Sequence, residues 1–324
     1  MLKIGLIGCG FMGTMHANCY KNIPGVEIVA VADIRREKAE EVAVGTDAVI
    51  YGEGRELIAN AEIDIIDICL PTYLHAEYAL LAMDKVRYVF IEKPVALTVA
   101  EGKALLEKAE KCGAMVQVGQ VIRFWDEYVE LAKIIKSGVY GKVINANFRR
   151  ISPRPEWGWE NWLLDFSKSG GAAQDLHVHD IDYALSVFGE PESFYSVKNR
   201  IGEKNSYIDT LMAYKDFVVS VEGTWDLPAS HPFEATFRVV FEKAVIENAG
   251  KLMRYDANGA EEIVIEKKQL AGGGYTGGNI ADLGGYYNEL CYFCERAAKK
   301  EAIERATLAD GVASLEFLLR EIAD

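Results

Sequence analysis

Apolar residues recur along the first 120 residues in short continuous runs, and each run is followed by a segment with helical periodicity. The runs lie at residues 2–7, 26–33, 48–51, 63–72, 87–94 and 114–120. Strands that are apolar nearly throughout are typical of a sheet covered on both faces. Strands that alternate with helices at this interval form βαβ units, so we expect a doubly wound parallel sheet.

The pattern changes after about residue 123, where strand-like segments begin to follow one another with only turn residues between them. This arrangement predicts a largely antiparallel sheet. The expected strands are 142–150, 193–201, 207–216, 217–226, 233–242, 244–250, 251–259 and 261–268. The expected helices are 126–137, 172–188, 279–299 and 307–322.

The chain has 324 residues, which is long for one hydrophobic core. We therefore expect an α/β protein of two domains. Residues 1–122 form an N-terminal Rossmann-type doubly wound domain, and residues 123–324 form an α+β domain with a large, mostly antiparallel sheet.

The charge of the chain argues against two classes of binding partner. The formal net charge is −14, and a surface this acidic repels nucleic acid and anionic lipid headgroups. No run approaches the roughly 18 apolar residues of a membrane span. The first residues lack the charge pattern and cleavage site of a signal peptide, so we expect a cytoplasmic protein without nucleic-acid or membrane partners.

Among the six cysteines, Cys291 and Cys294 form the only close pair, inside a helical-looking segment. A zinc site requires a second pair or neighbouring histidines, and the sequence offers neither nearby. We interpret the pair as two half-buried thiols on a helix and expect no metal.

Three glycines with the spacing Gly8-x-Gly10-x-x-Gly13 stand between the first strand and the first helix. In this context Gly8 permits a tight turn, Gly10 lets the backbone approach a pyrophosphate, and Gly13 lets helix and strand pack closely. The N-terminus of the helix offers N–H groups and a positive dipole end to the phosphates. The motif predicts a dinucleotide site; the alternative is a purely structural glycine turn.

Asp33 stands twenty residues after Gly13, at the end of the second strand. A carboxylate at this place hydrogen-bonds an adenosine ribose diol and repels a 2′-phosphate, which favours NAD over NADP. Arg35 and Arg36 leave the alternative open, because a guanidinium there can bind the phosphate. The other interpretation is that these two arginines form ion pairs with glutamates on the helix surface.

Two stretches occupy the carboxyl ends of strands, where ligands of open α/β sheets bind. In "CLPTYLH", Thr72 is placed to cap the next helix and His75 lies in its first turn. In "IEKP", Lys93 precedes Pro94 and is expected to point toward the crevice. The candidate cofactor-binding residues are Gly8, Gly10, Phe11, Met12, Gly13, Asp33, Ile34, Leu70, Pro71, Thr72, His75, Glu92 and Lys93.

The helix expected at 172–188 carries a polar stripe. At about 100° per residue, Asp175, His179 and Asp182 fall on one side, whereas His177 points about 200° away from Asp175. A histidine between two carboxylates is a candidate proton acceptor for an alcohol, because its ordinary pKa is about 6.5. A simple salt bridge is the alternative. Lys93 is then placed to stabilise a developing alkoxide, and Asp175 to orient the imidazole or to bind a neighbouring hydroxyl.

The glycine motif, Asp33, "LPTYLH", "EKP" and "GGAAQDLHVHDID" together resemble the Gfo/Idh/MocA oxidoreductase family, over most of the chain. The resemblance implies a Rossmann domain followed by a substrate-binding and oligomerisation domain with an open sheet, and oxidation or reduction of a sugar, inositol or nucleotide-sugar with NAD(P). It assigns Lys93, Asp175 and His179 to catalysis or substrate orientation, and Asp182 to a sugar hydroxyl.

This chain departs from the family pattern at "VGQVIRF", where Arg123 is kept but Gln120 and Ile122 replace an aromatic residue and an arginine. The loop at 153–162 offers three tryptophans that could stack on a sugar or simply pack, and Tyr275 lies in a glycine-rich segment that resembles a flap. The candidate substrate residues are Lys93, Arg123, Trp162, Asp175, His179 and Asp182.

The leading hypothesis is an NAD(P)-dependent sugar or polyol dehydrogenase, similar to an inositol 2-dehydrogenase. One alternative is an NAD-dependent glycoside hydrolase or lyase that oxidises a ring carbon transiently. Another is a non-catalytic NAD-binding sensor, although such a protein is expected to lack the catalytic trio. An apolar face on a long antiparallel sheet favours a homodimer or homotetramer.

Overall fold

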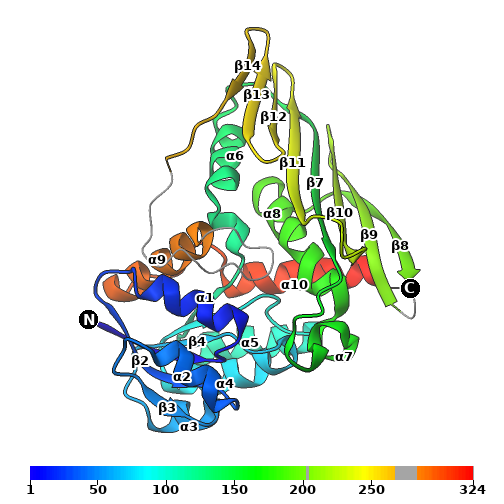
Figure 1. Cartoon of the computed structure of the whole chain (residues 1–324). Helices are drawn as coiled ribbons and strands as arrows, with labels where there is room; N and C mark the ends of the chain where they lie inside the picture. The colour runs from blue at the N-terminus through cyan, green and yellow to red at the C-terminus, as the bar shows by residue number, and fades with distance from the viewer. Residues whose placement is uncertain (202–203, 267–282, 324) are drawn as a thin grey trace. The chain divides into compact units, whose positions relative to one another are not determined.

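The computed structural model describes residues 1–201, 204–266 and 283–323 (Figure 1). As far as these residues extend, the chain divides into two compact units. The first contains residues 1–124 and 268–315, and the second contains residues 125–267 and 316–324. Each unit is built around its own sheet.

The sheet of the first unit is parallel throughout. Its strands are β1 (Leu2–Ile7), β2 (Val26–Ala32), β3 (Val49–Tyr51), β4 (Ile65–Ile68), β5 (Tyr88–Ile91) and β6 (Met115–Val118). The order β3-β2-β1-β4-β5-β6 is that of a Rossmann fold, which confirms the predicted fold class. The switch point between β1 and β4 is where such sheets bind ligands.

Helices follow the strands as expected. They are α1 (Phe11–Tyr20), α2 (Arg36–Ala43), α3 (Gly54–Asn60), α4 (His75–Lys85) and α5 (Val99–Cys112). Local signals explain their ends: in α5, Thr98 and Glu101 form a capping box, and Gly113 ends the helix in the left-handed conformation.

A C-terminal stretch completes this unit. Helix α9 (Gly284–Lys299) packs beside α1, and the chain then leads through a bridge between Gln117 and Thr307 into α10 (Leu308–Ile322) (Figure 1). The first unit is thus built from two separate stretches of chain. The predicted division between residues 122 and 123 does not include this feature.

The second unit holds an eight-stranded sheet with the order β14-β13-β12-β11-β7-β10-β9-β8. Only the pair β7 and β10 is parallel, which agrees with the predicted, mostly antiparallel sheet. The strands are β7 (Val143–Pro153), β8 (Ser193–Ile201), β9 (Lys204–Ala213), β10 (Val218–Leu227), β11 (Glu234–Phe241), β12 (Ala244–Asn248), β13 (Leu252–Asp256) and β14 (Gly259–Glu262). The helices are α6 (Asp126–Ser137), α7 (Phe166–Ser169) and α8 (Val178–Phe188).

One face of this sheet is covered by α6 and α8. Tyr128 of α6 and Tyr183 of α8 meet Phe148 and Phe237 from the sheet in edge-on ring contacts. All four rings are buried, so this aromatic group forms the centre of the second core.

Two sequence predictions were wrong in detail. The last strand was expected at 261–268, but β14 pairs with β13 through a tight turn at Asp256–Gly259, which moves the strand to 259–262. The helix expected from residue 172 is interrupted at its start, because Ala173–His177 form a π-helical turn before α8 begins. The beginning of the helix predicted at 279–299 lies outside the described residues.

Candidate active site

The glycine turn between β1 and α1 is shaped by two glycines that the fold itself requires. Gly8 has φ of +92°, and a Cβ there would lie 2.4 Å from the carbonyl oxygen of Cys69. A Cβ on Gly13 would lie 1.8 Å from the carbonyl oxygen of Gly8. Both contacts are with backbone, so neither position accepts a side chain.

Gly10 differs from the other two glycines, because the protein gives no steric reason for it. A Cβ there would meet only the guanidinium of Arg35, at an ordinary 3.6 Å. Gly10 is also the N-cap of α1, and no side chain caps this helix end. A glycine that leaves room above an uncapped helix N-terminus fits a pyrophosphate at that place.

Asp33 follows β2 and is tied to the glycine turn. Its Oδ2 accepts the backbone N–H of Cys9 at 2.8 Å, and its Oδ1 accepts the backbone N–H of Arg35 at 2.8 Å. The Arg35 guanidinium also contacts both carboxylate oxygens, at 3.2 and 3.3 Å. The carboxylate is therefore held in a fixed orientation beside Gly10.

The two arginines after Asp33 have different partners. Arg36 pairs with Glu40 on the exposed surface of α2 at 2.9 Å, which agrees with the predicted ion pairing to glutamates. Arg35 pairs instead with Asp33, so it lies at the candidate ribose site. Ile34, between them, is 64% exposed.

The segment after β4 differs from its prediction at Thr72. This residue opens a 3₁₀ turn at Thr72–Leu74, and α4 begins only at His75. Thr72 is therefore too early to cap α4, and its buried hydroxyl has no hydrogen-bond partner among the residues that the structure describes.

His75 lies in the first turn of α4 as predicted, but its ring is 1% exposed. Nδ1 lies 2.7 Å from the carbonyl oxygen of Pro94, and Nε2 lies 2.7 Å from that of Leu70. Burial lowers the pKa of His75 below its ordinary value. The ring thus joins the "LPT" segment to the "EKP" turn.

Lys93 follows β5 at the carboxyl edge of the parallel sheet, and the Lys93–Pro94 bond is cis. Its side chain is partly exposed, whereas Glu92 before it is 4% exposed. The backbone N–H of Lys93 donates to Oε2 of Glu92 at 3.1 Å. Glu92, a candidate for cofactor contact, thus turns toward the inside of the unit.

Sequence reasoning missed a cluster of buried polar residues beneath this turn. His16 of α1 lies 2.8 Å from Asp67 of β4 and 3.1 Å from Glu92, and the thiol of Cys69 lies 3.2 Å from the same imidazole. The third carboxylic acid of the cluster, Glu289 of α9, is fully buried. The sequence does contain one signal for this cluster, because Asp67 is a charged residue in an otherwise apolar strand.

Burial and the neighbouring charges shift the pKa values of the groups in this cluster. Burial opposes the protonation of His16, but the carboxylate of Asp67 outweighs it, so the pKa of His16 lies well above its ordinary value. Burial, reinforced by the charge of Glu92, raises the pKa of Glu289 well above its ordinary value. The structure therefore favours a charged imidazole and a neutral Glu289.

The second unit carries the other predicted catalytic residues. Asp175 lies in the π-helical turn and is half-buried, whereas His179 and Asp182 lie in α8 with 9% and 0% exposure. The α-helical arithmetic that placed Asp175 on their stripe does not apply across the turn, because π-helical hydrogen bonds link residues five apart. π-helical turns of this kind often occur at functional sites.

His177 does not lie in an open site. It is fully buried against β10, where a Cβ on Gly223 would lie 2.6 Å from its Nδ1. Its Nε2 lies 3.6 Å from Glu321. Asp180 is likewise structural, since its carboxylate binds the guanidinium of Arg150 at 2.7 and 3.2 Å.

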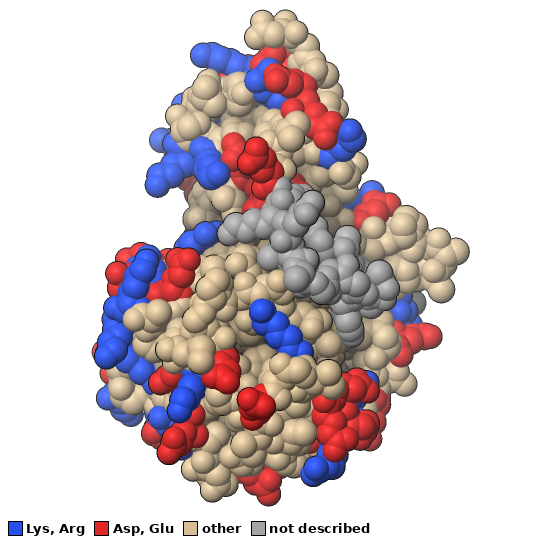
Figure 2. Space-filling view, turned by 60° about the vertical axis from the view of Figure 1, so that its left-hand side comes forward, with Lys and Arg blue, Asp and Glu red and all other residues tan. Residues whose placement is uncertain are grey.

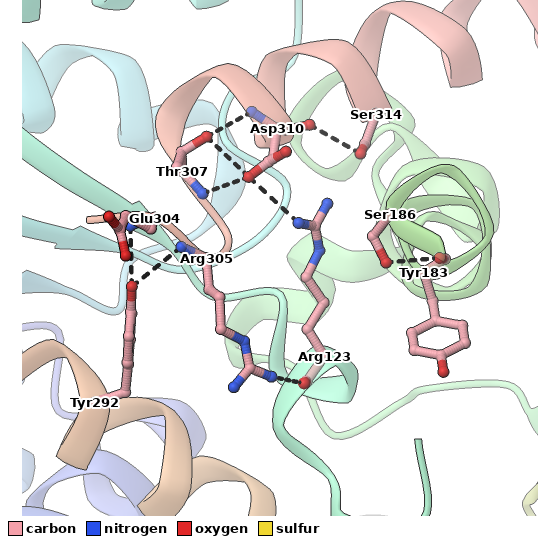
Figure 3. A network of polar contacts seen from close by, with 9 residues as sticks. All are labelled: Arg123, Tyr183, Ser186, Tyr292, Glu304, Arg305, Thr307, Asp310 and Ser314. Carbon is pink, nitrogen blue, oxygen red and sulfur yellow. Dashed lines mark hydrogen bonds and ion pairs between the residues drawn. The ribbon is translucent and has the colours of Figure 1, made fainter. Parts of the chain in front are cut away.

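Arg123, a candidate substrate residue, lies within a polar network around the start of α10 (Figure 3). Its guanidinium pairs with Asp310 at 3.3 Å, and its carbonyl oxygen accepts a hydrogen bond from Arg305. Asp310 also accepts the N–H and hydroxyl of Thr307, each at 2.8 Å. The side chain is 11% exposed, so this residue helps fix α10. Its contact with substrate stays a prediction.

Trp162 is half-buried and packs against a small apolar cluster of Leu163, Ala172 and Trp225. The residues before it, Glu160 and Asn161, both have φ near +50°. Tyr275 lies outside the described residues.

Acidic and basic side chains alternate in small groups on the face shown in Figure 2. Among the described residues, no helix combines the length and the apolar character needed to cross a bilayer.

Comparisons with known proteins agree with this geometry. Residues 2–120 match the family described as "Oxidoreductase family, NAD-binding Rossmann fold", and residues 128–247 match the "GFO/IDH/MocA C-terminal domain". Together the two matches cover most of both units.

Individual relatives carry related names. A myo-inositol 2-dehydrogenase of Thermotoga maritima is 29% identical over 194 residues, which are 58% of this chain and 55% of that protein. A scyllo-inositol 2-dehydrogenase (NAD(+)) of Bacillus subtilis is 29% identical over 241 residues, which are 72% of this chain and 68% of that protein.

Among solved structures, a levoglucosan dehydrogenase in complex with NADH and L-sorbose superposes with a TM-score of 0.84. The match covers 99% of this chain and 96% of that one at 22% identity, and it establishes the fold alone.

Proposed function

Because the chain belongs to the Gfo/Idh/MocA oxidoreductase family, we propose that it transfers a hydride between NAD and a secondary alcohol carbon of a sugar, inositol or nucleotide-sugar. The observation that carries the proposal is Lys93 at the carboxyl edge of a sheet whose glycine turn leaves room for a dinucleotide at Gly10. The names of the inositol dehydrogenases that it resembles support the substrate class.

Residues of the first unit would hold the cofactor, whose nicotinamide accepts the hydride when bound. The N-terminus of α1 and Gly10 would face the pyrophosphate, and Asp33 would accept hydrogen bonds from the ribose diol. We assign NAD rather than NADP, because the Asp33 carboxylate disfavours a 2′-phosphate even though Arg35 lies beside it.

Three side chains would move or stabilise charge on the substrate. His179 accepts the proton of the reacting hydroxyl, so that one proton leaves the oxygen as one hydride leaves the carbon. The Lys93 ammonium stabilises the negative charge that develops on this oxygen. Asp175 orients the imidazole, and Asp182 and Trp162 bind the remainder of the substrate.

The experiment is a survey of substrates with purified protein. Inositols, aldoses and nucleotide-sugars are each incubated with NAD or NADP, and NADH or NADPH formation is followed by its ultraviolet absorbance. Steady NADH formation with one class supports the proposal. Glycoside cleavage without net NADH, or NAD binding without turnover of any compound, would contradict it.

Lys93→Met tests the chemical step. It is expected to lower kcat by about 10²–10³-fold, because one preorganised charge on the developing alkoxide is lost. NADH affinity, measured by fluorescence titration, is expected to stay within a few-fold of the wild-type value.

A further inference from the structure

The buried cluster beneath the Lys93 turn has no part in the chemistry proposed above. We define it by five residues of the first unit: His16, Asp67, Cys69, Glu92 and Glu289. Burial of this many ionisable groups costs free energy unless they pair, so their arrangement needs a reason.

His16 lies between two carboxylates. Its Nδ1 is 2.8 Å from Oδ2 of Asp67, and its Nε2 is 3.1 Å from Oε1 of Glu92. An ionised carboxylate only accepts hydrogen bonds, and a neutral imidazole has one nitrogen with a lone pair. If both carboxylates are ionised, that lone pair faces an anion in either tautomer, so the two contacts favour a ring with both nitrogens protonated.

The other groups that face His16 do not supply a competing positive charge. Cys19 and Tyr20 come from α1, Cys69 directly follows β4, and Glu289 and Cys294 come from α9. Burial raises the pKa of each of these groups, which keeps them neutral. The charge of Arg305 favours ionisation of Glu289, but burial and the charge of Glu92 outweigh it. The charged part of the cluster is thus the His16 cation with Asp67 and Glu92.

Glu92 connects this cation to the turn. One oxygen faces His16, and the other accepts the backbone N–H of Lys93 at 3.1 Å. The carboxylate also lies against Gly119, where a Cβ would come within 2.8 Å of Oε1. His16 and the Gly119 backbone therefore restrict the carboxylate that meets the Lys93 backbone.

We propose that His16 is a positioning residue: as a buried cation between Asp67 and Glu92, it fixes the Glu92 carboxylate and thereby the backbone of Lys93. The inference rests on the proposed function for the role of Lys93, but the state of His16 is measurable without substrate. The proposed activity and the proposed charge state of His16 can therefore be disproved independently.

The charge state is measured by nitrogen-15 NMR of histidine-labelled protein without ligands. His16→Gln assigns the signal, and His231→Gln, which removes an exposed imidazole of the second unit, is the control. His16 is expected to show two protonated ring nitrogens at pH 7, above the ordinary histidine pKa of about 6.5. A neutral tautomer at pH 7, or stoichiometric zinc in the purified protein, would overturn the proposal.

The positioning role is measured by kinetics. His16→Gln and Glu92→Gln are each expected to lower kcat by about 10–100-fold with KM changed less than about threefold, because a small misplacement of a reacting group is costly. The double variant is expected to lose no more than the poorer single variant. Thermal melting and NADH titration identify any variant that does not fold, and His231→Gln is expected to match wild type.

Asp67→Asn separates positioning from mere stability. The amide oxygen still accepts the Tyr20 hydroxyl, but the cation loses one of its two anions. This variant is expected to keep its kcat at about pH 6 and to lose it at a lower pH than wild type, as His16 deprotonates. If the kcat profiles of Asp67→Asn and wild type have the same shape, the positioning role is wrong. If NMR shows the cation but no polyol is oxidised, the proposed function fails instead.

Discussion

At the scale of single residues, Asp33 is the basis of the proposed preference for NAD over NADP. Its carboxylate is oriented by Cys9 and Arg35 without being removed from the surface entirely, since 8% of the residue is exposed. Asp33→Asn is expected to weaken NADH binding by about 10–100-fold, because a hydrogen bond to a charged acceptor contributes about 1.5–3 kcal/mol. Fluorescence titration with NADH and NADPH measures both affinities.

The neighbouring arginines provide a matched control. Arg35→Gln is expected to lower any residual NADPH affinity, since its guanidinium lies at Asp33, whereas Arg36→Gln is expected to change neither affinity. An equal effect of the two substitutions would contradict the assignment of the ribose site.

The glycine motif and Asp33 were predictable because each has a fixed spacing and a steric or electrostatic reason. His16 and Asp67 were not predicted, although both are visible in the sequence. Their interaction joins residues 51 positions apart on different elements, and a pair of this kind leaves no periodic pattern. Thr72 was misplaced for a local reason: one 3₁₀ turn precedes α4 and shifts the cap.

At the scale of elements, the β1–α1 turn separates glycines needed for folding from one available to a ligand. Gly13→Ala is expected to lower the free energy of unfolding by about 3 kcal/mol, because its Cβ would overlap the Gly8 carbonyl oxygen. Gly10→Ala is expected to change stability by less than about 0.5 kcal/mol but to weaken NADH binding by about tenfold. Urea unfolding and NADH titration test the pair.

A loss of stability in Gly10→Ala as large as in Gly13→Ala would show that all three glycines are structural. The dinucleotide site would then lack its main support in this structure.

Elements were most predictable where one signal dominated. The apolar run of β1 and the amphipathic pattern of α6 matched the structure at both ends. The π-helical turn at Ala173–His177 was not predictable, because a fixed angle of about 100° per residue assumes a regular α-helix. The position of β14 depended on the turn at Asp256–Gly259 rather than on the apolar residues that follow it.

At the scale of the whole molecule, Glu289 predicts how stability changes with pH. Its pKa is raised in the folded state, so the folded protein keeps a proton that the unfolded chain releases above about pH 4.3. Stability from this group is therefore lost as pH rises toward the folded pKa. The Glu289→Gln variant has no ionisable group at this position, so its stability does not fall with rising pH for this reason.

The variant is expected to gain on wild type by about 1.4 kcal/mol for each pH unit above the unfolded-chain pKa of about 4.3, until the folded pKa of Glu289 is reached. Urea unfolding across this interval measures the difference. A difference that is constant with pH would mean that Glu289 is ionised in the folded protein.

Exposed apolar residues on one face of the eight-stranded sheet predict self-association. Tyr195 and Leu211 are cross-strand neighbours, Val197 shares their face, and the three are 45–71% exposed. An apolar face on a long sheet is a common dimer interface, so we propose a homodimer or homotetramer. Tyr195→Glu with Leu211→Glu is expected to give monomers in light scattering, whereas Val139→Glu, an exposed apolar residue on the loop after α6, is expected to leave the oligomer intact.

Because α9 belongs to the first unit, recombination between homologous genes can separate residues that contact each other. The helix brings Glu289 into the group around His16, so the first unit is encoded by two separate stretches of the gene. A single crossover with a homologous gene after codon 124 would pair one parent's His16 and Asp67 with the other parent's α9. Recombinants of this type are expected to survive only when both parents carry compatible acids at these places, whereas an exchange with two crossovers, at the borders of the middle segment, keeps the unit whole.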